Sequence, residues 1–316
     1  MKKKENHILD YLMSNRDIYL SGNYISSKLG ISRAAVWKKI CGLRQKGYRI
    51  SARPNCGYRL DEEPDQLNKD LLEEKNIVFY QAVDSTNLAI RRLAEQGLPG
   101  YSTLIAEEQL KGRGRLGRNW FSPPNSGLWF SLLLRPELLS PAAAAPVTLV
   151  TAAVLAKNLR EKHALPITIK WPNDLLVNGI KFGGILSELK GEPDRIDYLV
   201  IGVGLNINQQ QSDFPAELSA QATSLFAESG RHFDRTSLFL AMWNDLVQAY
   251  KHFFKQGFAP FRDQILQYNS FIGQEVNVKW PGGTLKGFAS DLTAEGALLI
   301  KDKKGKTRVV NYGEIW

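Results

Sequence analysis

Apolar side chains recur at helical spacing along the first 46 residues, and a glycine separates two of the predicted helices. A first helix is expected around residues 8–12 and a second over residues 24–29, ending at Gly30, which suits a left-handed helix end. Ser32 can cap a third, longer helix that runs from Arg33 to about Lys46. The positions of this helix available to the core are Ala34, Val36, Ile40 and Leu43. Two helices joined through a Leu-Gly-Ile turn have the spacing of a helix-turn-helix.

Two short β-like runs follow these helices and predict a small basic hairpin. They occupy residues 48–50 and 58–60, on either side of a turn that contains a proline and a glycine. A hairpin in this place is the wing of a winged helix-turn-helix domain. The acidic stretch at residues 61–65 then reverses the charge and includes a proline, so we expect the first domain to span residues 1–65.

Predicted strands and helices alternate in the central part of the chain. The strands are expected at residues 77–82, 103–107, 128–134, 167–170, 175–177, 180–188 and 198–203. The helices are expected at residues 85–96, 142–162, 236–255 and 258–268. Asn178-Gly179 is the strongest two-residue hairpin signal in the chain. This mixture of hairpins and helices predicts an α+β domain with a mixed sheet over residues 66–268.

The pattern changes again after residue 268. Short apolar runs alternate with turns that contain glycine, which predicts a small β-barrel over residues 269–316. The runs lie at residues 276–280, 287–289, 297–300 and 308–310, and the turns at residues 281–283, 294–296 and 303–305. The chain is therefore expected to be a multidomain α+β protein with three domains.

Positive charge is concentrated in the first domain. Residues 1–60 hold seven lysines and six arginines against three acidic residues, whereas the whole chain of 316 residues has a net charge of +9. The rest of the chain is therefore close to neutral. A basic block on a folded helix-turn-helix is the electrostatic footprint of DNA binding, which it favours over a three-helix interaction module. The side chains expected to contact phosphates and base edges are Ser32, Arg33, Ala35, Trp37, Lys38 and Lys39.

The composition is that of an ordinary soluble globular protein, with 43% hydrophobic and 23% charged residues. The two cysteines, Cys41 and Cys56, form no CxxC pair and show no zinc spacing, which favours the reducing cytoplasm. Asp10 interrupts the apolar stretch near the N-terminus, so no signal peptide is expected. No window approaches the roughly 18 uninterrupted apolar residues of a membrane span. We expect a cytoplasmic protein with no membrane partner.

Residues 112–120, with the sequence GRGRLGRNW, form the most unusual segment of the chain. Three glycines make its backbone permissive, and three arginines give it dense positive charge. Such a loop is expected to become ordered around an anion, because phosphate relieves the repulsion among the arginines. Trp120 is suited to stacking on a purine. The alternatives are a basic nucleic-acid-binding loop or a solvated turn, and the segment does not match the P-loop pattern.

Three further segments carry polar groups suited to a ligand. Residues 170–174, KWPND, place a lysine, an amide and a carboxylate at a strand end, where Asp174 is a candidate magnesium ligand. Lys181 lies on an otherwise apolar strand beside a Gly-Gly pair, where a ligand can approach the backbone closely. Residues 84–87, DSTN, can cap a helix or bind a small polar ligand. From spacing alone, KWPND is equally an Asn-Asp turn, and a lone lysine such as Lys181 usually faces solvent.

Taken in order, the segments DSTN, AEEQ…GRGRLGRNW, KWPND, IKFGGIL and GVGLNIN resemble the biotin–protein ligase family. With the winged helix before them, they resemble the bifunctional type that doubles as a biotin operon repressor. The resemblance covers essentially the whole chain. It implies a central domain with the class II aminoacyl-tRNA synthetase/biotin ligase-like fold and a C-terminal SH3-like β-barrel.

The resemblance also implies a role for each motif residue. A biotin site would be formed by Ser85, Thr86, Asn87, Gln109, Arg113, Gly114, Arg115 and Lys181. Within it, Gln109 would bind the ureido ring and Lys181 the biotin carboxylate and the phosphate. The nucleotide would be contacted by Arg118, Trp120, Asn173 and Asn206, and magnesium by Asp174. The catalytic groups would be Arg113, Arg115, Lys170 and Lys181, while Leu116 stands where some relatives have another basic residue.

By this resemblance, the protein would use ATP and Mg²⁺ to convert biotin into biotinyl-5′-AMP. It would then pass biotin to a lysine of a biotin carboxyl carrier or carboxylase acceptor domain. Bound adenylate would promote a homodimer that binds operator DNA and represses genes for biotin synthesis or uptake.

Three other functions stay open from the sequence: a ligase whose N-terminal domain does not regulate, a lipoate–protein ligase, and a ligand-sensing transcription factor without catalysis. The GRGRLGR and KWPND motifs argue against the lipoate ligase. The charge of the first domain argues against a domain without a function.

Overall fold

A computed structural model describes residues 6–45, 47–136, 140–192, 194–280 and 283–315. The chain divides into two compact units, Met1–Gln66 and Leu67–Trp316. The predicted helix end at Lys46 and the first two residues of the predicted turn at 281–283 lie outside the described residues.

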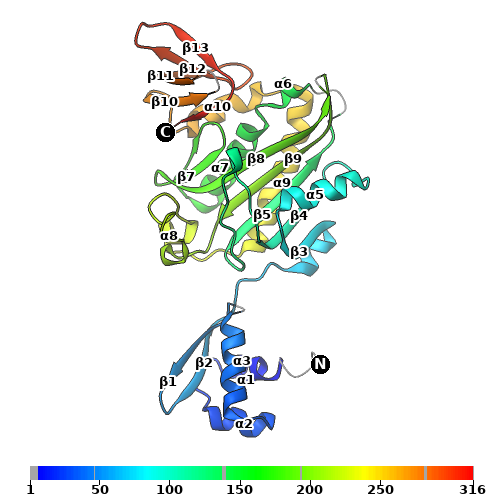
Figure 1. Ribbon diagram of the computed structural model, residues 1–316, viewed down its shortest axis with the longest axis vertical. Coiled ribbons are helices and arrows are strands. Elements are labelled where there is room, and N and C mark those ends of the chain that lie inside the picture. Colours follow the sequence, from blue (N-terminus) through cyan, green and yellow to red (C-terminus); the bar gives the residue numbers. More distant parts are fainter. Residues whose placement is uncertain (1–5, 46, 137–139, 193, 281–282, 316) are drawn as a thin grey trace. The chain divides into compact units, whose positions relative to one another are not determined.

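The first unit contains the three helices and the hairpin expected from the sequence (Figure 1). Its elements are α1 (Asn6–Met13), α2 (Gly22–Leu29), α3 (Arg33–Gln45), β1 (Arg49–Arg53) and β2 (Gly57–Glu62). Helix α2 ends at Gly30, which has the left-handed φ of 61°. At the start of α3 the Ser32 hydroxyl accepts a hydrogen bond from the Ala35 amide. Both predicted helix caps are therefore confirmed.

A small apolar core holds the first unit together. Its buried residues are Ile8, Leu12, Leu20, Ile25, Val36, Ile40, Leu43, Ile50 and Leu60. The prediction that Ala34 faces this core is wrong, because Ala34 is exposed. Val36, Ile40 and Leu43 define the buried face of α3. Ala34 lies two positions before Val36, which rotates it by about 200° around the helix axis, away from that face.

A seven-stranded mixed sheet forms the centre of the second unit (Figure 1), as predicted. Its strands are β3 (Ile77–Val83), β4 (Thr103–Gln109), β5 (Gly127–Leu134), β6 (Ile167–Lys170), β7 (Asp174–Val177), β8 (Ile180–Glu192) and β9 (Arg195–Asn206). They follow the order β3-β4-β5-β9-β8-β7-β6. Only the β3–β4 pair is parallel among these neighbours. The predicted turn at Asn178-Gly179 joins β7 to β8, with positive φ at both residues.

Helices bury both faces of this sheet. Strand β5 is buried along its whole length, which accounts for a sequence in which Ser131 is the one polar side chain. Phe130 and Leu132 pack in the cluster that includes α7 (Val147–His163) and α9 (Arg235–Gln256), whereas Leu133 packs with α5 (Thr86–Glu95). Because side chains alternate along a strand, α5 lies on one face of the sheet, and α7 and α9 lie on the other.

The single helix predicted at residues 142–162 is two helices in the structure, α6 (Pro141–Ala144) and α7. Pro146 separates them, because proline lacks the amide hydrogen that a continuous helix would need there. The stretch Pro141–His163 is long and apolar enough to cross a membrane, but 72% of its most apolar window is buried inside the protein. Its apolar residues therefore belong to the core around the sheet. Two short helices, α4 (Lys69–Glu74) and α8 (Leu225–Ser229), were not predicted.

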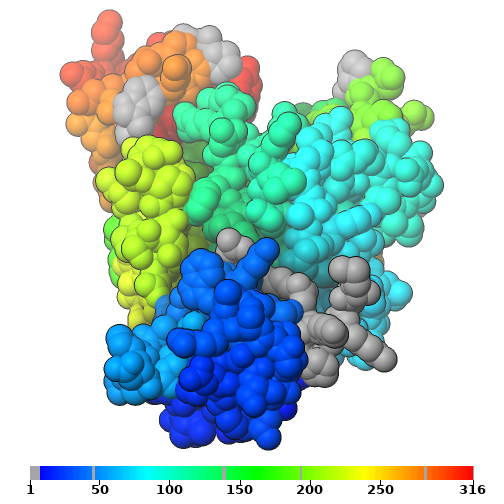
Figure 2. Space-filling view, turned by 60° about the horizontal axis from the view of Figure 1, so that its bottom comes forward, coloured from blue at the N-terminus to red at the C-terminus, as the bar shows by residue number. Residues whose placement is uncertain are grey.

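The last part of the second unit is a five-stranded antiparallel sheet that follows α10 (Ala259–Tyr268). Its strands are β10 (Glu275–Trp280), β11 (Gly283–Leu292), β12 (Leu298–Asp302), β13 (Thr307–Val310) and β14 (Glu314–Ile315). The first four correspond to the predicted runs, and β14 was missed. Val278 and Ile300 belong to the same buried cluster as the central sheet. The C-terminal sheet, orange to red in Figure 2, accordingly lies against the rest of its unit.

Candidate functional site

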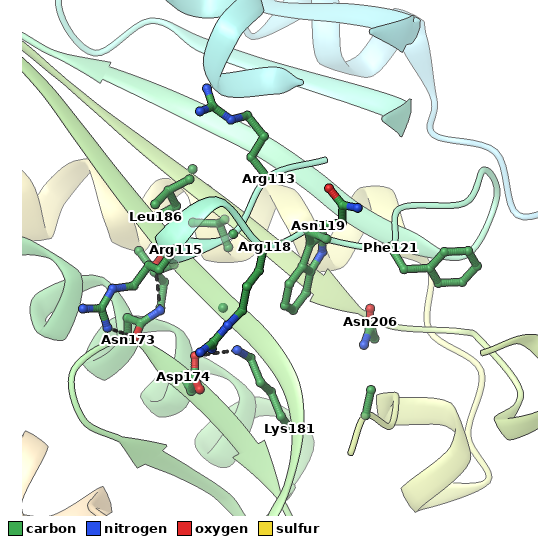
Figure 3. A pocket seen from close by; sticks show the side chains of 18 of the residues that line it. Arg113, Arg115, Arg118, Asn119, Phe121, Asn173, Asp174, Lys181, Leu186 and Asn206 are labelled. Carbon is green, nitrogen blue, oxygen red and sulfur yellow. Dashed lines mark hydrogen bonds and ion pairs between the residues drawn. The ribbon is translucent and has the colours of Figure 1, made fainter. Parts of the chain in front are cut away.

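A pocket in the second unit gathers side chains from segments that are far apart in the sequence (Figure 3). The predicted site residues that line it are Ser85, Thr86, Asn87, Gln109, Arg113, Gly114, Arg115, Arg118, Trp120, Asn173, Asp174, Lys181 and Asn206. Lys170 is not among the lining residues. It ends β6, where its backbone pairs with Asp174.

At one end of the pocket lie Thr86, Asn87 and Gln109, and the buried Ser131, outside the lining itself, hydrogen-bonds to the first two. We define these four residues as the polar row. The Gln109 side-chain oxygen accepts hydrogen bonds from the Thr86 amide at 2.8 Å and the Thr86 hydroxyl at 3.1 Å. The Ser131 hydroxyl oxygen lies 2.8 Å from Thr86 Oγ1 and 2.7 Å from Asn87 Oδ1. The side chains of this row therefore hold one another in fixed orientations before any ligand arrives.

The DSTN segment begins helix α5 and leaves its own polar side chains at the pocket. Ser85 is the N-cap residue, but its side chain makes no capping hydrogen bond. Asp84 instead accepts a hydrogen bond from the Ser85 amide and two from the Arg92 guanidinium, each at 2.8 Å. The Arg92 guanidinium, through these hydrogen bonds, lowers the pKa of Asp84 to about 2. Within this motif, Asp84 therefore stabilises the helix start, whereas Ser85, Thr86 and Asn87 line the pocket.

Two glycines of the GVGLNIN motif let side chains pack directly on β9. A Cβ atom at Gly202 would lie 2.2 Å from Asn87 Oδ1, and one at Gly204 would lie 2.5 Å from Trp120 Nε1. Both distances are too short for a real Cβ atom, so a side chain at either position would have to displace Asn87 or Trp120. The indole N–H of Trp120 is buried and has no hydrogen-bond partner within the protein.

The arginine loop, residues 112–120, turns sharply at Leu116, which has a positive φ of 56° and is 74% exposed. Arg115 donates hydrogen bonds to Asn173 Oδ1 at 2.9 Å and to the Gly313 carbonyl oxygen at 3.0 Å. Burial lowers the pKa of the Arg115 guanidinium, while nearby carboxylates act in the opposite sense. An arginine stays charged under any ordinary condition, so Arg115 brings a partly desolvated positive charge to the pocket.

The other two arginines of the loop contact carboxylates. Arg118 donates two hydrogen bonds to Glu314, at 2.9 and 2.7 Å, and Arg113 lies 3.8 Å from Glu188. Figure 3 shows that Arg115 and Arg118 point toward the side of the pocket that holds Asp174, whereas Arg113 points the other way. Glu188 also accepts a hydrogen bond from the Asn87 side chain at 2.8 Å, so it joins the arginine loop to the polar row.

Lys181 faces the pocket rather than solvent. Its Nζ atom lies 2.7 Å from Asp174 Oδ1 and 5.4 Å from the centre of the Trp120 ring. Strand β8 carries Lys181, and β7 begins at Asp174, so the hairpin between the two strands brings the pair together. The structure thereby decides between the two interpretations of Lys181 that the sequence left open.

The second end of the pocket is therefore a cationic end, formed by Arg115, Arg118 and Lys181. Each of these cations contacts a protein oxygen. Such a group of cations suits a ligand that carries several negative charges. No cluster of three or more His, Cys, Asp or Glu side chains that could hold a metal occurs within the described part of the chain.

Sequence reasoning missed several residues of the site. Ser131 lies on an apolar strand, and Glu188 and Glu314 lie outside any recognised motif, yet all three contact predicted residues. The further lining residues that were missed include Asn119, Phe121, Phe214, Leu218, Gln221 and Ala222. The alternation along β5 could have placed Ser131 on the α5 face, but no local signal identifies Glu314.

The first unit presents most of its predicted DNA contacts at the surface. Ser32, Arg33, Trp37 and Lys38 are exposed, and Trp37 has an exposed fraction of 60%. Ala35 and Lys39 are partly exposed. A large aromatic side chain beside basic residues on the second helix of a helix-turn-helix is suited to contact the bases and phosphates of a DNA groove.

Comparison with known protein families matches three segments of the chain. Residues 78–206 match the Biotin/lipoate A/B protein ligase family, and residues 4–59 match an HTH domain. Residues 271–316 match the Biotin protein ligase C terminal domain. These segments together span the N-terminal helix-turn-helix, the central sheet and the C-terminal sheet.

Individual proteins resemble the chain over most of its length. The bifunctional ligase/repressor BirA of Bacillus subtilis is 34% identical over 92% of this chain and 92% of its own. The protein of the same name from Escherichia coli is 33% identical over 92% of this chain and 90% of its own. A solved structure, the biotin protein ligase from Aquifex aeolicus in complex with biotin and ATP, has a TM-score of 0.67 and 32% identity. It covers 77% of this chain and 98% of its own.

Proposed function

The chain belongs to the family of bifunctional biotin–protein ligases and repressors, and we propose that it joins biotin to a lysine of an acceptor protein in an ATP-dependent reaction. The observation that carries this proposal is the pairing of a buried polar row with a cationic end in one pocket. The first suits a small uncharged polar ring, and the second suits phosphates and a carboxylate.

The first half-reaction activates biotin, because a free carboxylate is a poor acylating group. A carboxylate oxygen of biotin attacks the α-phosphorus of ATP, the bond to the pyrophosphate oxygen breaks, and biotinyl-5′-AMP and pyrophosphate form. Lys181 would hold the biotin carboxylate and the α-phosphate, with Arg113 and Arg115 stabilising the charge on the transferring phosphorus. Lys181 is suited to this role because its ammonium group already binds a carboxylate, that of Asp174.

The second half-reaction transfers the biotinyl group. The ε-amine of the acceptor lysine attacks the carbonyl carbon of the adenylate, the bond to the AMP oxygen breaks, and an amide forms as the amine loses a proton. Gly114 lies in the arginine loop, which we propose closes over the adenylate and excludes water that would hydrolyse it. We propose a biotin carboxyl carrier or carboxylase domain as the acceptor. Lys170 lies outside the pocket lining, so we assign it a supporting role on the strand next to Asp174.

The polar row favours biotin over lipoate as the substrate. We propose that Ser85 and the row, with Gln109 closest to the ring, offer donors and acceptors to the ureido group of biotin. The dithiolane ring of lipoate has no N–H group and no carbonyl with which to satisfy such groups. It would therefore leave the remaining donor and acceptor positions of these groups unused, which would select against lipoate.

The donor set fits a magnesium ion that arrives with ATP rather than one held by a protein cage. The lining carboxylates, Asp174 and Glu314, are each paired with a cation. Magnesium at nucleotide sites commonly takes one or two carboxylates together with substrate phosphates. We propose that Asp174 would hold the magnesium ion and that the bound ion would neutralise phosphate charge. The nucleotide itself would be bound by Arg118, Trp120, Asn173 and Asn206.

A pyrophosphate-release assay tests the ligase proposal. The purified protein is given Mg·ATP with biotin, with lipoate, or with neither, and then an acceptor domain from a biotin-dependent carboxylase. We expect pyrophosphate release when Mg·ATP is combined with biotin, but not with lipoate or with neither. In the complete mixture we expect biotin on the acceptor lysine. Equal release with lipoate would favour a lipoate ligase, and no release with either would favour a sensor without catalysis.

We also propose that the first unit binds operator DNA and represses genes of biotin synthesis or uptake in the cytoplasm. The observation in favour is the exposed Trp37 on α3, with Arg33 and Lys38 exposed on the same helix. We propose that bound adenylate promotes a homodimer, since a helix-turn-helix protein usually reads a two-fold site as a dimer.

Titration of DNA from upstream of the organism's biotin genes tests the repressor proposal. Binding is measured with and without biotin plus Mg·ATP at one fixed salt concentration, because a basic domain binds any DNA to some degree. Sedimentation of the same samples reports the dimer. We expect sequence-specific binding that tightens with the ligands. Weak binding that ignores them would leave a ligase whose N-terminal unit does not regulate.

A further inference from the structure

The C-terminal strand reaches into the pocket and contacts two arginines of the arginine loop. Glu314 accepts two hydrogen bonds from Arg118, at 2.9 and 2.7 Å. The preceding carbonyl, that of Gly313, accepts one from Arg115 at 3.0 Å. Both partners lie almost 200 residues away in the sequence. The proposed chemistry requires the two arginines but gives Glu314 no task.

The position of Glu314 is built into the C-terminal sheet. Strand β14 pairs with β10 through Lys279 opposite Glu314. A Cβ atom at Gly313 would lie 2.7 Å from the Lys279 carbonyl oxygen, so only glycine lets the chain approach β10 so closely. The Glu314 side chain is 23% exposed, whereas that of Arg118 is 65% exposed. Pairing with β10 therefore fixes the backbone that carries the carboxylate, and Arg118 is the more exposed partner.

We propose that Glu314 is an internal substitute for a nucleotide phosphate, which binds Arg118 and weakens ATP binding by competition. This inference rests on the proposed ligase function. A guanidinium group binds a carboxylate and a phosphate through the same pair of parallel hydrogen bonds, so Arg118 cannot give its full fork to both.

We expect this competition to change the Kd for ATP but not the Kd for biotin. Arg118 and Glu314 both line the pocket, but neither belongs to the polar row that we assign to the biotin ring. Exposed ion pairs are weak, and a bidentate pair is at the strong end of that range. Removing the carboxylate should therefore lower the Kd for ATP by about three- to tenfold.

Calorimetric titration of the full-length protein with ATP, without biotin, tests this proposal. The variant Glu314→Gln keeps the size of the side chain and removes its charge. We expect it to bind ATP about three- to tenfold more tightly than the unaltered protein. Inorganic pyrophosphate, used as a second probe, should show a gain in the same direction, and the Kd for biotin should stay the same.

Two controls separate local competition from a general change of charge. Glu275→Gln removes an acidic group from the neighbouring strand β10, where Glu275 pairs with Lys286 at 3.4 Å, and should not change the Kd for ATP. In an Arg118→Gln background, Glu314→Gln should have no further effect on ATP binding. If Glu314→Gln melts early, Glu314→Asp withdraws the carboxylate from Arg118 and should also tighten ATP binding.

The outcomes distinguish this inference from the ligase proposal. If the unaltered protein binds no ATP and releases no pyrophosphate with biotin, the ligase function itself is wrong. If it does both, and the folded Glu314 variants bind ATP equally or more weakly, the competition is wrong. A gain that persists in the Arg118→Gln background would also overturn it, because the effect would not pass through this arginine.

Discussion

The two ends of the pocket hold their polar groups in different ways. In the polar row, buried hydroxyl and amide groups bind one another at 2.7–3.1 Å, and Ser131 is 0% exposed. At the cationic end, Arg118 and Lys181 form ion pairs with carboxylates, and Arg118 has an exposed fraction of 65%. The polar row is an uncharged set of groups oriented by one another, whereas the cationic end is a set of charges whose protein partners a ligand can replace.

This difference follows from the ligands that each end has to accept. A neutral ring is recognised by hydrogen-bonding groups that are already oriented, because their ordering then costs nothing at the moment of binding. Several phosphates bring a large negative charge, and unpaired cations would repel one another in the empty pocket. Carboxylates that can be displaced reduce this repulsion. They also lower the affinity of the cationic end for the phosphates, because they compete for the same cations.

The largest expected effect is at the cationic end, where Lys181 has no substitute. Lys181→Ala should slow pyrophosphate release by at least about a hundredfold, because it removes a charge that acts on the transferring phosphorus. Lys190→Ala is the matched control, since Lys190 lies on the same strand but pairs with Glu95 away from the pocket. Near-normal biotin transfer by Lys181→Ala would remove this lysine from the mechanism.

Two glycines of β9 allow the two ends to be disturbed separately. Gly202→Ala should displace Asn87 and weaken biotin binding by about tenfold, the loss expected when buried hydrogen bonds are broken. Gly204→Ala should instead displace Trp120 and mainly weaken ATP binding. Equilibrium titrations of each variant with biotin and with ATP make the comparison. Equal losses for both ligands in both variants would show that the ends are not independent.

Salt should distinguish the two ends in the unaltered protein. Raising the concentration of potassium chloride from about 0.05 to about 0.5 M shortens the screening length and weakens the attraction between exposed cations and a polyanion. The KM for ATP should rise by roughly three- to tenfold. The KM for biotin should change less, because most of its contacts are with uncharged groups. A parallel rise of both constants would contradict the division.

The smallest expected effect concerns the helix start beside the polar row. Arg92 lowers the pKa of Asp84 to about 2, so the carboxylate stabilises the fold above its ordinary pKa of about 3.9 and loses this effect as the pH falls toward 2. The side chain of Asp84 is 37% exposed, which limits its contribution. Asp84→Asn should therefore reduce the free energy of unfolding by about 0.5 kcal/mol at pH 7.

Urea unfolding at several pH values between about 7 and about 2.5 measures this change. The difference between Asp84→Asn and the unaltered protein should shrink steadily in the acid range. Asp263→Asn is the control, because Asp263 is 97% exposed. A difference that stays constant with pH would mean that Asp84 acts by shape rather than by charge.

Much of this architecture could be predicted from local patterns. The helix caps at Gly30 and Ser32, the apolar strand β5 and the Asn178-Gly179 turn each depend on residues next to one another in the chain. The same applies to the site motifs, since Lys181 and the arginine loop were identified as ligand-binding candidates before their positions were known. The helix break at Pro146 was missed because the surrounding alanine-rich sequence favours a continuous helix.

The partners of those motif residues could not be predicted. Glu107 of the AEEQ motif forms a buried ion pair with Arg235 at 2.7 Å, and it accepts hydrogen bonds from the amides of Leu67 and Asn125. This glutamate therefore supports the fold rather than the ligand. No neighbouring residue in the sequence indicates that Glu107 has this structural role rather than a ligand-binding one.

By itself, the sequence determined the kinds of elements, the basic character of the first domain and the residue types that the chemistry needs. It did so because helix caps, turns and alternation act between near neighbours. The tertiary structure alone decided that Ser131 orients the polar row and that Glu314 holds Arg118. Such pairings join segments up to 196 residues apart, and only the packed sheets bring their atoms within hydrogen-bonding distance.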